Sequence, residues 1–126
     1  MSREKLKRFE GQKYLTLESY RKTGAGVATP VWFAEDGGRF YIYSLANAGK
    51  VKRIRNNPRV RVAPCDIRGN RTGEWEEGTA RILLDAAEAE RAHRLLDRKY
   101  GWMKRIGNLY SKLVKRERAA IAISLE

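Results

Sequence analysis

The sequence predicts an α+β fold in which six antiparallel strands form a barrel and helices are segregated to one side. Five strand-like segments follow one another, joined by short turns and one short helix. Two helical stretches come late in the chain, and a last apolar strand closes it. Consecutive strands with short connections favour an antiparallel barrel, and late helices favour an α+β arrangement. The 126 residues contain no repeat or linker, so we expect one domain over residues 1–126.

The first part of the chain predicts a short helix and three strands. Residues 1–10 form a basic N-terminal segment, in which Ser2–Phe9 is expected to be helical, with Leu6 and Phe9 as apolar contacts. Alternating, β-branched and aromatic residues then predict strands at Lys13–Tyr20, Val27–Ala34 and Arg39–Ser44. The glycines of Asp36-Gly37-Gly38 predict a hairpin turn before the third strand.

Pro30 lies inside the second of these strands, within V-A-T-P-V-W-F-A. Proline has no N–H to donate to a strand ladder. We therefore predict that this strand lies at a sheet edge, is bulged, or faces a ligand at Pro30.

The middle of the chain predicts one helix and two strands. Asn47 is expected to cap a helix over Ala48–Asn56, which Pro58 ends. Val51 and Ile54 form the inward face of this helix. Alternating residues predict strands at Arg59–Cys65 and Glu74–Leu84, the second with Gly78, Ala80, Ile82 and Leu84 on one face.

The last third of the chain predicts two helices and a strand. Asp85 and Glu88 have the spacing of a capping box, and the helix that they start is expected to run to about Lys99. Gly101 breaks it. A second helix follows, with apolar residues at helical spacing from Trp102 to Leu113, and the final strand is predicted at Ala119–Leu125.

The composition narrows the class of function. A net charge of +12 on so short a chain predicts an anionic partner: nucleic acid, an anionic membrane or a multiply charged small molecule. No apolar run reaches the roughly 20 residues of a membrane-spanning helix, and no signal region follows Met1. With Cys65 as the single cysteine, these features favour the cytoplasm. With His93 as the single histidine, neither a metal site nor a Ser-His-Asp arrangement is expected.

The basic residues concentrate where a phosphate site could form. No acidic residue occurs between Gly37 and Cys65, whereas seven basic ones do. A strand end and a helix start bring together Ser44, Asn47, Gly49 and Lys50. Free N–H groups and the helix dipole favour an anion there, and glycine allows close approach. This pattern is consistent with a phosphate cradle. Spacing alone, however, favours an ordinary capped surface helix over a phosphate site.

Other polar and aromatic residues have simpler interpretations. Trp102 is expected in the core, His93 on a solvent-facing helix surface, and Cys65 as a small buried residue. Trp32 is a candidate for stacking on a ring because it follows Pro30. The acidic run at residues 74–77 and the basic run at residues 98–118 are interpreted as solvated surfaces.

Three stretches resemble the split-barrel flavin-binding family related to pyridoxamine 5'-phosphate oxidase. They are T-P-V-W-F from Thr29, G-K-V-K-R-I-R-N-N-P-R-V from Gly49 and A-P-C-D-I-R-G from Ala63. They are most similar to its branch of coenzyme F-420 (8-hydroxy-5-deazaflavin) dependent oxidoreductases. The resemblance extends from about Lys13 to Leu125. It implies a six-stranded split barrel that forms a homodimer, with cofactor sites at the dimer interface.

The resemblance also implies which residues bind the cofactor. Ser44 and Lys50 would hold its phosphate, and the ring would lie along residues 29–32. Arg68, Asn70 and Trp75 are expected to complete the pocket from the partner subunit. The full set of predicted cofactor-binding residues is Thr29, Pro30, Val31, Trp32, Ser44, Gly49, Lys50, Val51, Lys52, Arg53, Arg55, Arg68, Asn70 and Trp75.

The family resemblance leaves coenzyme F-420, FMN and haem as possible cofactors. The single histidine disfavours pyridoxamine phosphate oxidation and haem binding. F-420 ends in a phosphodiester and several glutamates, so the cations at Lys50, Lys52, Arg53 and Arg55 favour it over FMN, which remains the alternative.

The leading hypothesis is an F-420-dependent reductase that passes a hydride to an electron-poor small molecule such as an enone or quinone, with Tyr41, Tyr43 or a water as the proton donor. An FMN-dependent oxidoreductase and a non-enzymatic cofactor binder are the alternatives. Nucleic-acid binding is disfavoured because no recognisable motif supports it, and membrane binding because neither terminal helix is suitably amphipathic.

Overall fold

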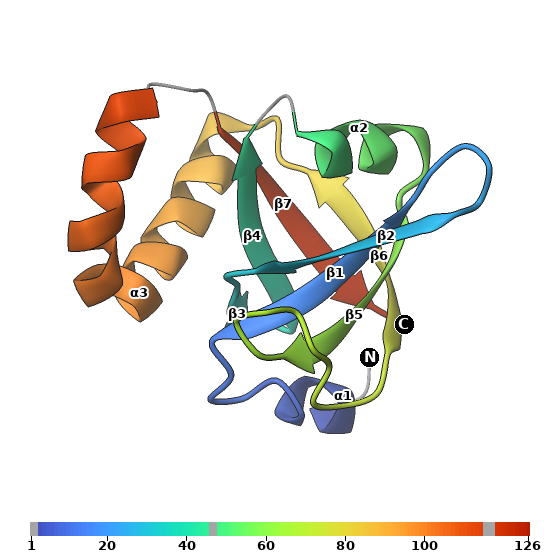
Figure 1. Ribbon diagram of the computed structural model, residues 1–126. Helices are drawn as coiled ribbons and strands as arrows, with labels where there is room; N and C mark the ends of the chain where they lie inside the picture. The colour runs from blue at the N-terminus through green and yellow to red at the C-terminus, as the bar shows by residue number, and fades with distance from the viewer. Residues whose placement is uncertain (1–2, 46–47, 115–117) are drawn as a thin grey trace.

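The protein folds into a curled, seven-stranded antiparallel sheet flanked by three helices (Figure 1). This computed structural model describes residues 3–45, 48–114 and 118–126, with side chains at 4–44, 48–100 and 119–126. The strand order is β2-β1-β5-β6-β7-β4-β3. The strands are β1 (Tyr14–Tyr20), β2 (Gly26–Val31), β3 (Ala34–Asp36), β4 (Arg39–Leu45), β5 (Arg59–Cys65), β6 (Glu76–Ile82) and β7 (Arg118–Leu125). The helices are α1 (Arg3–Lys7), α2 (Gly49–Asn56) and α3 (Ala86–Val114).

The two edge strands of this sheet are consecutive in the chain. β2 pairs with β1 and β3 pairs with β4, and only Trp32 and Phe33 separate them. The sheet must therefore curl until its two ends meet, which gives the split barrel its shape. The predicted strand Val27–Ala34 is thus two strands, and the sheet has seven strands instead of the predicted six. Of the three alternatives predicted from Pro30, the structure shows the edge position.

The hydroxyl of Tyr100, at the middle of α3, explains why this strand breaks. It accepts a hydrogen bond from the Phe33 N–H (3.1 Å) and donates toward the carbonyl oxygens of Lys13 and Phe33 (2.6 and 2.8 Å). The backbone polar groups of Phe33 are therefore satisfied by a side chain instead of a strand ladder. Burial raises the pKa of Tyr100 to about 12, so it keeps this proton.

The barrel interior is a continuous apolar core. Its largest buried side chains come from the inward faces of the strands and from both ends of the barrel. At one end, Val51 and Ile54 of α2 reach inward, as the sequence predicts. At the other end lies α1, and Phe9, which follows it, packs against Phe33 and Phe40. The two short helices thus close opposite ends of the barrel (Figure 1).

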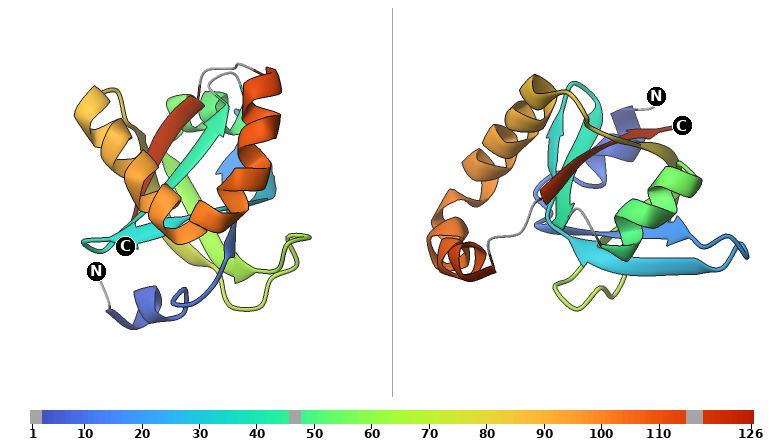
Figure 2. Two further views of the ribbon diagram at one scale, coloured as in Figure 1. Left: turned by 90° about the vertical axis from the view of Figure 1, so that its left-hand side faces the viewer. Right: turned by 90° about the horizontal axis from the view of Figure 1, so that it is seen from above.

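α3 consists of two helical segments that meet at Tyr100, whose φ of −115° and ψ of 18° lie outside the helical region. The predicted break at Gly101 is therefore one residue late. Figure 2 shows the two segments as a V beside β4 and β7. Asp85 caps the helix, because its Oδ1 accepts from the Ala87 N–H (2.9 Å). Glu88 binds Arg81 instead of completing the capping box.

Several local predictions differ from the structure. Ala48 is the residue before α2 and makes no side-chain cap, while Asn47 lies outside the described residues. Leu84 is exposed because β6 ends at Ile82, and Leu83 is buried instead. Glu76 belongs to the acidic run that was expected to be solvated, but it is buried under α1, where Arg8 Nη1 lies 2.6 Å from its Oε1.

The described residues limit two kinds of site. Among the helices of this part of the chain, none has an apolar stretch long enough to cross a bilayer. No three His, Cys, Asp or Glu side chains within the described ranges gather as a metal site would require. Cys65 is buried and unpaired, and burial raises the pKa of its thiol to about 11.

Candidate functional site

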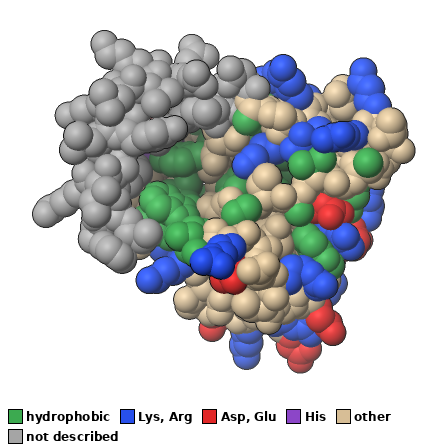
Figure 3. Space-filling view, in the orientation of Figure 1, with side chains coloured by type: hydrophobic (Ala, Val, Ile, Leu, Met, Phe, Trp, Pro, Cys, Tyr) green, Lys and Arg blue, Asp and Glu red, His purple; other side chains and the backbone are tan. Residues whose placement is uncertain are grey.

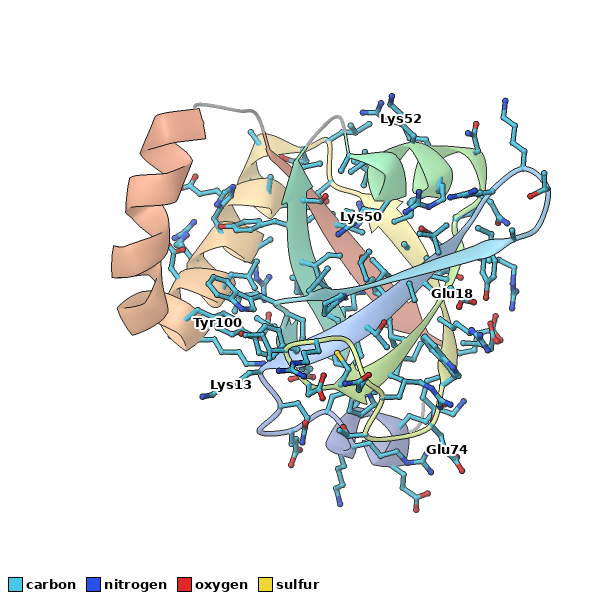
Figure 4. The ribbon with its side chains drawn as sticks, viewed as in Figure 1. Lys13, Glu18, Lys50, Lys52, Glu74 and Tyr100 are labelled. Atoms are coloured by element: carbon cyan, nitrogen blue, oxygen red, sulfur yellow. The ribbon has the colours of Figure 1, made fainter. Side chains whose placement is uncertain are left out.

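The N-terminus of α2 presents Gly49 and Lys50 beside the end of β4. Figure 4 shows Lys50 directed from α2 toward the space between β4 and β2, whereas Lys52 points away from it. The N–H groups of Val51 and Lys52 already bond to the Ala48 carbonyl. The first-turn amides of Gly49 and Lys50 therefore remain as donors without a partner in the described part of the chain, and they favour an anion.

Arg53 reaches back over this first turn from one turn further along the helix. Side chains of a helix lean toward its N-terminus, so residue i+4 covers residue i. A Cβ on Gly49 would lie 2.8 Å from Arg53 Nη1, so the guanidinium rests directly against the glycine. Arg53 Nε donates to Oγ of Ser19 (2.7 Å), a buried residue of β1. The absence of a side chain at residue 49 thus allows Arg53 to lie beside Lys50.

Lys50 and Arg53 form a pair of cations that no carboxylate of the described residues neutralises. Partial burial, and secondly the charge of Arg53, lower the pKa of Lys50. Burial and the charge of Arg21 lower the pKa of Arg53. Within the described residues, no carboxylate lies within 4.0 Å of a nitrogen of either side chain. An anion would stabilise these two partly desolvated cations, which have no counterion in the described part of the chain.

Thr29 adds an unsatisfied polar atom on the neighbouring strand. Its Oγ1 is buried and has no hydrogen-bond partner among the described atoms. Thr29 shares a face of β2 with Val27, which is registered opposite Ser19 on β1. Two residues along a strand span about 7 Å. A ligand that reaches Lys50 and Arg53 therefore lies within reach of the Thr29 hydroxyl. A buried hydroxyl without a hydrogen-bond partner is rare in proteins.

The break between β2 and β3 carries an aromatic stack. The Trp32 ring lies parallel to the Tyr100 ring, with an interplanar angle of 6° and centroids 4.7 Å apart. Trp32 and Tyr43 pack against the small cluster of Ala34, Leu96 and Tyr100. Figure 3 shows a hollow on this face, with hydrophobic side chains in it and Lys and Arg side chains at its α2 side. A flat, anionic molecule suits both surfaces.

The remaining predicted residues of this region divide into buried and exposed ones. Ser44 is half-buried at the end of β4, next to the N-terminus of α2. Val51 and Val31 are buried, so they reach a ligand only through their backbone. Lys52 and Arg55 are exposed on α2. Pro30 is exposed on β2.

The structure does not bring all predicted residues together within one chain. Arg68 and Asn70 lie in an exposed loop, where the Asn70 side chain bonds to Asp66, and this loop approaches Pro30 through Gly69. The guanidinium groups of Arg61 and Arg71 both lie over the Trp75 ring, 4.2 and 5.3 Å from its centroid. Its neighbour Glu74 is at the opposite end of the barrel from Lys50 (Figure 4).

The sequence did not indicate four contributors to this region. Ser19 and Arg21 act on Arg53 from β1 and the turn after it. Tyr100 comes from α3, and its only signal is its place just before a predicted helix break. His93, which was expected to face solvent, is half-buried, with Nδ1 2.5 Å from the Tyr43 Oη. All these contacts join residues distant in sequence, which a local pattern does not report.

A family model described as pyridoxamine 5'-phosphate oxidase matches residues 2–126. No curated protein is similar enough in sequence to count as a match.

Three solved structures illustrate the similarity in fold. A conserved hypothetical protein from Mycobacterium tuberculosis aligns with a TM-score of 0.73 and 19% identity, over 100% of this chain and 81% of that one. An FAD-binding protein from Mesorhizobium loti gives 0.67 and 16%, over 98% and 86%. A heme storage protein from Vibrio cholerae gives 0.67 and 13%, over 98% and 86%. At these identities, the likeness is one of fold.

Proposed function

Because the chain belongs to the flavin-binding pyridoxamine 5'-phosphate oxidase family, we propose that it binds a phosphorylated flavin-type cofactor and acts as an oxidoreductase. The cofactor that we favour is coenzyme F-420, with FMN as the alternative. The substrate class is an electron-poor small molecule, such as an enone or a quinone, that accepts a hydride. We also propose that the protein acts as a homodimer.

The observation that carries this proposal is the cation pair at the start of α2. Lys50 and Arg53 are partly desolvated and face no carboxylate among the described residues, and the Arg53 guanidinium lies against Gly49. A phosphate group would neutralise them and accept from the first-turn N–H groups. The buried Thr29 Oγ1 has no partner, and a polar edge of the cofactor would supply one. The residues present therefore fit the group that the family implies.

The protein's part in the reaction is binding, orientation and proton control. The reduced cofactor supplies the hydride. Lys50 and Arg53 would hold the phosphate, and residues 29–32 would lie along the ring. Tyr100 fixes Trp32 by stacking and holds the backbone of Phe33 through its hydroxyl. The ring-lining segment is thereby held in one conformation before the ligand arrives, which lowers the entropic cost of binding.

Reduction of an enone or a quinone also requires a proton, and Tyr43 is a candidate to deliver it. Its hydroxyl oxygen lies 2.5 Å from Nδ1 of His93, so a proton is held between the two side chains. Tyr43 packs on the same small cluster as Trp32. It therefore lies beside the segment that we propose to line the ring. After that transfer, His93 in the form that carries Nδ1–H would pass this proton to the Tyr43 oxygen, while its Nε2 would take up a proton from water.

Charge favours F-420 over FMN. A monophosphate is satisfied by Lys50, Arg53 and backbone N–H groups. Lys52, Arg55 and Arg21 are further cations on or beside α2, and all three are exposed. An extended tail of glutamates would lie among them.

The homodimer has a different support. Arg68, Asn70 and Trp75 do not join the cation pair within one chain, and a partner subunit would supply them.

Titration of the apoprotein with F-420, tailless deazaflavin and FMN tests this assignment. At low salt we expect the tailed F-420 to bind about fivefold more tightly than the tailless form, because exposed ion pairs contribute up to about 1 kcal/mol. The difference should shrink as salt screens these pairs. Quenching of Trp fluorescence is the readout. Equal affinities for tailed and tailless deazaflavin at low salt would contradict the tail argument, and no binding of any of the three would contradict the proposal.

Turnover distinguishes a reductase from a protein that only binds the cofactor. Reduced F-420 should be oxidised in the presence of cyclohex-2-enone or a benzoquinone, and its absorbance reports the rate. Tight binding without oxidation by either acceptor class would favour the non-enzymatic binder.

Substitution of Gly49 by alanine should separate binding from stability. The new Cβ would meet Arg53 Nη1 at 2.8 Å, so the guanidinium must move away from Lys50. We expect the Kd for the phosphorylated cofactor to rise about threefold to tenfold, the loss of one exposed or half-exposed charge contact. Unfolding should be unchanged or slightly more costly, since alanine favours a helix by up to about 1 kcal/mol.

A double-mutant cycle is the control for this substitution. In an Arg53→Ala background, Gly49→Ala should cause no further loss of cofactor affinity, because the side chain that it displaces is gone. If the two losses simply add, Arg53 does not act through its position over Gly49.

A further inference from the structure

A cavity lies away from the cation pair, at the α1 end of the barrel. Its volume is about 770 Å³. It lies between α1 and the turn after it, the β3–β4 hairpin and α3, which Figure 1 shows near one another. Its lining residues are Leu6, Lys7, Phe9, Glu10, Gly11, Phe33, Glu35, Gly37, Gly38 and Lys99. It shares none of them with the predicted cofactor site.

The apolar wall of this cavity is aromatic and firmly held. Phe9 and Phe33 pack edge to face, with an interplanar angle of 83° and centroids 6.1 Å apart. Both side chains are almost completely buried, so each presents only a small edge to a ligand in the cavity. Leu6 extends this wall and is half-buried. Since the aromatic pair belongs to the barrel core, the wall is preformed.

Lys99 places a cation against this apolar wall. Its Nζ lies 3.6 Å from the centroid of the Phe33 ring. Although much of the residue is exposed, burial around the ammonium lowers its pKa to about 8. Ring contacts compensate only part of the lost hydration of an ammonium group. Among the described residues, no carboxylate lies within 4.0 Å of this nitrogen.

The other charged residues of the cavity are engaged or lie at its exposed side. Glu35 Oε1 accepts from the Gly38 N–H (3.1 Å), within the hairpin turn. Lys7 and Glu10 are exposed and of opposite charge. Lys99 is therefore the charge that combines an apolar environment with the lack of a counterion.

We propose that this cavity binds a small molecule with an aromatic or alicyclic body and a carboxylate. The body packs against Leu6, Phe9 and Phe33, and the carboxylate pairs with Lys99 Nζ. The volume falls in the range of about 300–1,000 Å³ that is usual for small-molecule sites. A neutral ligand of the same shape would leave the ammonium without a partner, so the charge provides specificity.

This second site does not depend on the cofactor proposal. Lys50 and the cavity lie at opposite ends of the barrel, where α2 and α1 close it (Figure 1). Binding at the cavity can therefore be measured on protein without cofactor. If the protein fails to bind the cofactor, binding of a carboxylate at the cavity can still be tested, and the reverse also holds.

The test compares 2-naphthoate with 2-naphthamide, a neutral probe of nearly the same shape. NMR spectra of the ¹⁵N-labelled protein report binding through the amides of Gly37 and Gly38, which line the cavity. We expect 2-naphthoate to shift these amides and to bind at least about tenfold more tightly than 2-naphthamide, as a charge-assisted contact of about 1.5 kcal/mol gives. This comparison needs no variant, so it does not depend on the folding of one.

Substitutions at two lysines identify the cation. Lys99→Met should weaken 2-naphthoate binding to the level of 2-naphthamide, and Lys99→Arg should restore part of the difference. Lys22→Met removes the same charge from the exposed turn between β1 and β2 and should leave the affinity unchanged. Equal affinities of the two probes, shifts confined to residues outside the cavity, or an unchanged affinity in Lys99→Met would each overturn the proposal.

Discussion

Replacing Lys50 by alanine is expected to weaken binding of the phosphorylated cofactor by about 10- to 100-fold, the value of a charge-assisted hydrogen bond in a partly desolvated site. Lys50 is half-buried at the start of α2, and this burial, followed by the charge of Arg53 beside it, lowers its pKa. A phosphate would neutralise the pair. Without Lys50, Arg53 and the backbone must hold the phosphate alone. Fluorescence titration at fixed salt measures the change.

Two other lysines serve as controls for this substitution. Lys52 is on the same helix but points away from Lys50 (Figure 4), so Lys52→Ala should reduce the affinity for F-420 by no more than about threefold, the loss of one exposed contact to its tail. Lys7→Ala, in α1 at the opposite end of the barrel (Figure 1), should have no effect. If Lys52→Ala weakens binding as much as Lys50→Ala does, net charge rather than a built site holds the ligand.

Stability should respond to the loss of Lys50 in the opposite direction to binding. The folded state disfavours the charged form of this side chain, which is what a lowered lysine pKa means. Near neutral pH, removing the charge relieves that penalty. We therefore expect Lys50→Ala to unfold at the same or a higher denaturant concentration than the unmodified protein. A matching loss of stability and affinity would indicate misfolding instead of a lost contact.

Replacing Tyr100 by phenylalanine is expected to lower the free energy of unfolding by about 3 kcal/mol, because a buried polar group left without a partner costs roughly 1–3 kcal/mol. The lost hydroxyl binds the N–H and carbonyl of Phe33 and the carbonyl of Lys13. No strand ladder is available at the break to replace it. For a chain of this size, the midpoint of thermal unfolding should fall by roughly 10 °C.

Tyr41→Phe is the matched control for Tyr100→Phe. Tyr41 is half-buried beneath α3, whereas Tyr100 is buried, and no hydrogen bond of the Tyr41 hydroxyl occurs among the described residues. Its removal should change stability by no more than about 0.5 kcal/mol. Equal effects of the two substitutions would show that the Tyr100 hydroxyl does not hold the strand break.

The order of elements could be predicted from the sequence because each one carries its own local signal. Alternation marks β5, the glycines at residues 37 and 38 mark the hairpin, and Asp85 marks the start of α3. The split of one predicted strand into β2 and β3 could not be predicted. It depends on Tyr100, which lies 67 residues beyond Phe33 in the chain. A contact of that range leaves no trace in a local pattern.

In the candidate site, too, some residues have a local sequence signal and others do not. Gly49 and Lys50 were predicted because a helix start, a glycine and a cation are adjacent in sequence. The sequence suggested Arg53 only as part of a charge run. Its specific place, against Gly49 and bound to Ser19, needs the packing of α2 on β1. The burial of His93 against Tyr43 likewise needs α3 to lie on β4. Site residues that are adjacent in sequence could therefore be predicted, whereas their contacts with residues distant in sequence could not.

The interrupted strand also bears on aggregation. A sheet with open edges can recruit strands from other molecules. Here the two edges are β2, which carries a proline, and β3, which has three residues. A proline is tolerated at an edge when its nitrogen faces the open side, and a strand that tried to add there would find no donor. We therefore expect a second copy of this chain to meet the barrel through side chains and not by continuing its sheet, and the protein to resist fibril formation while this strand stays in place.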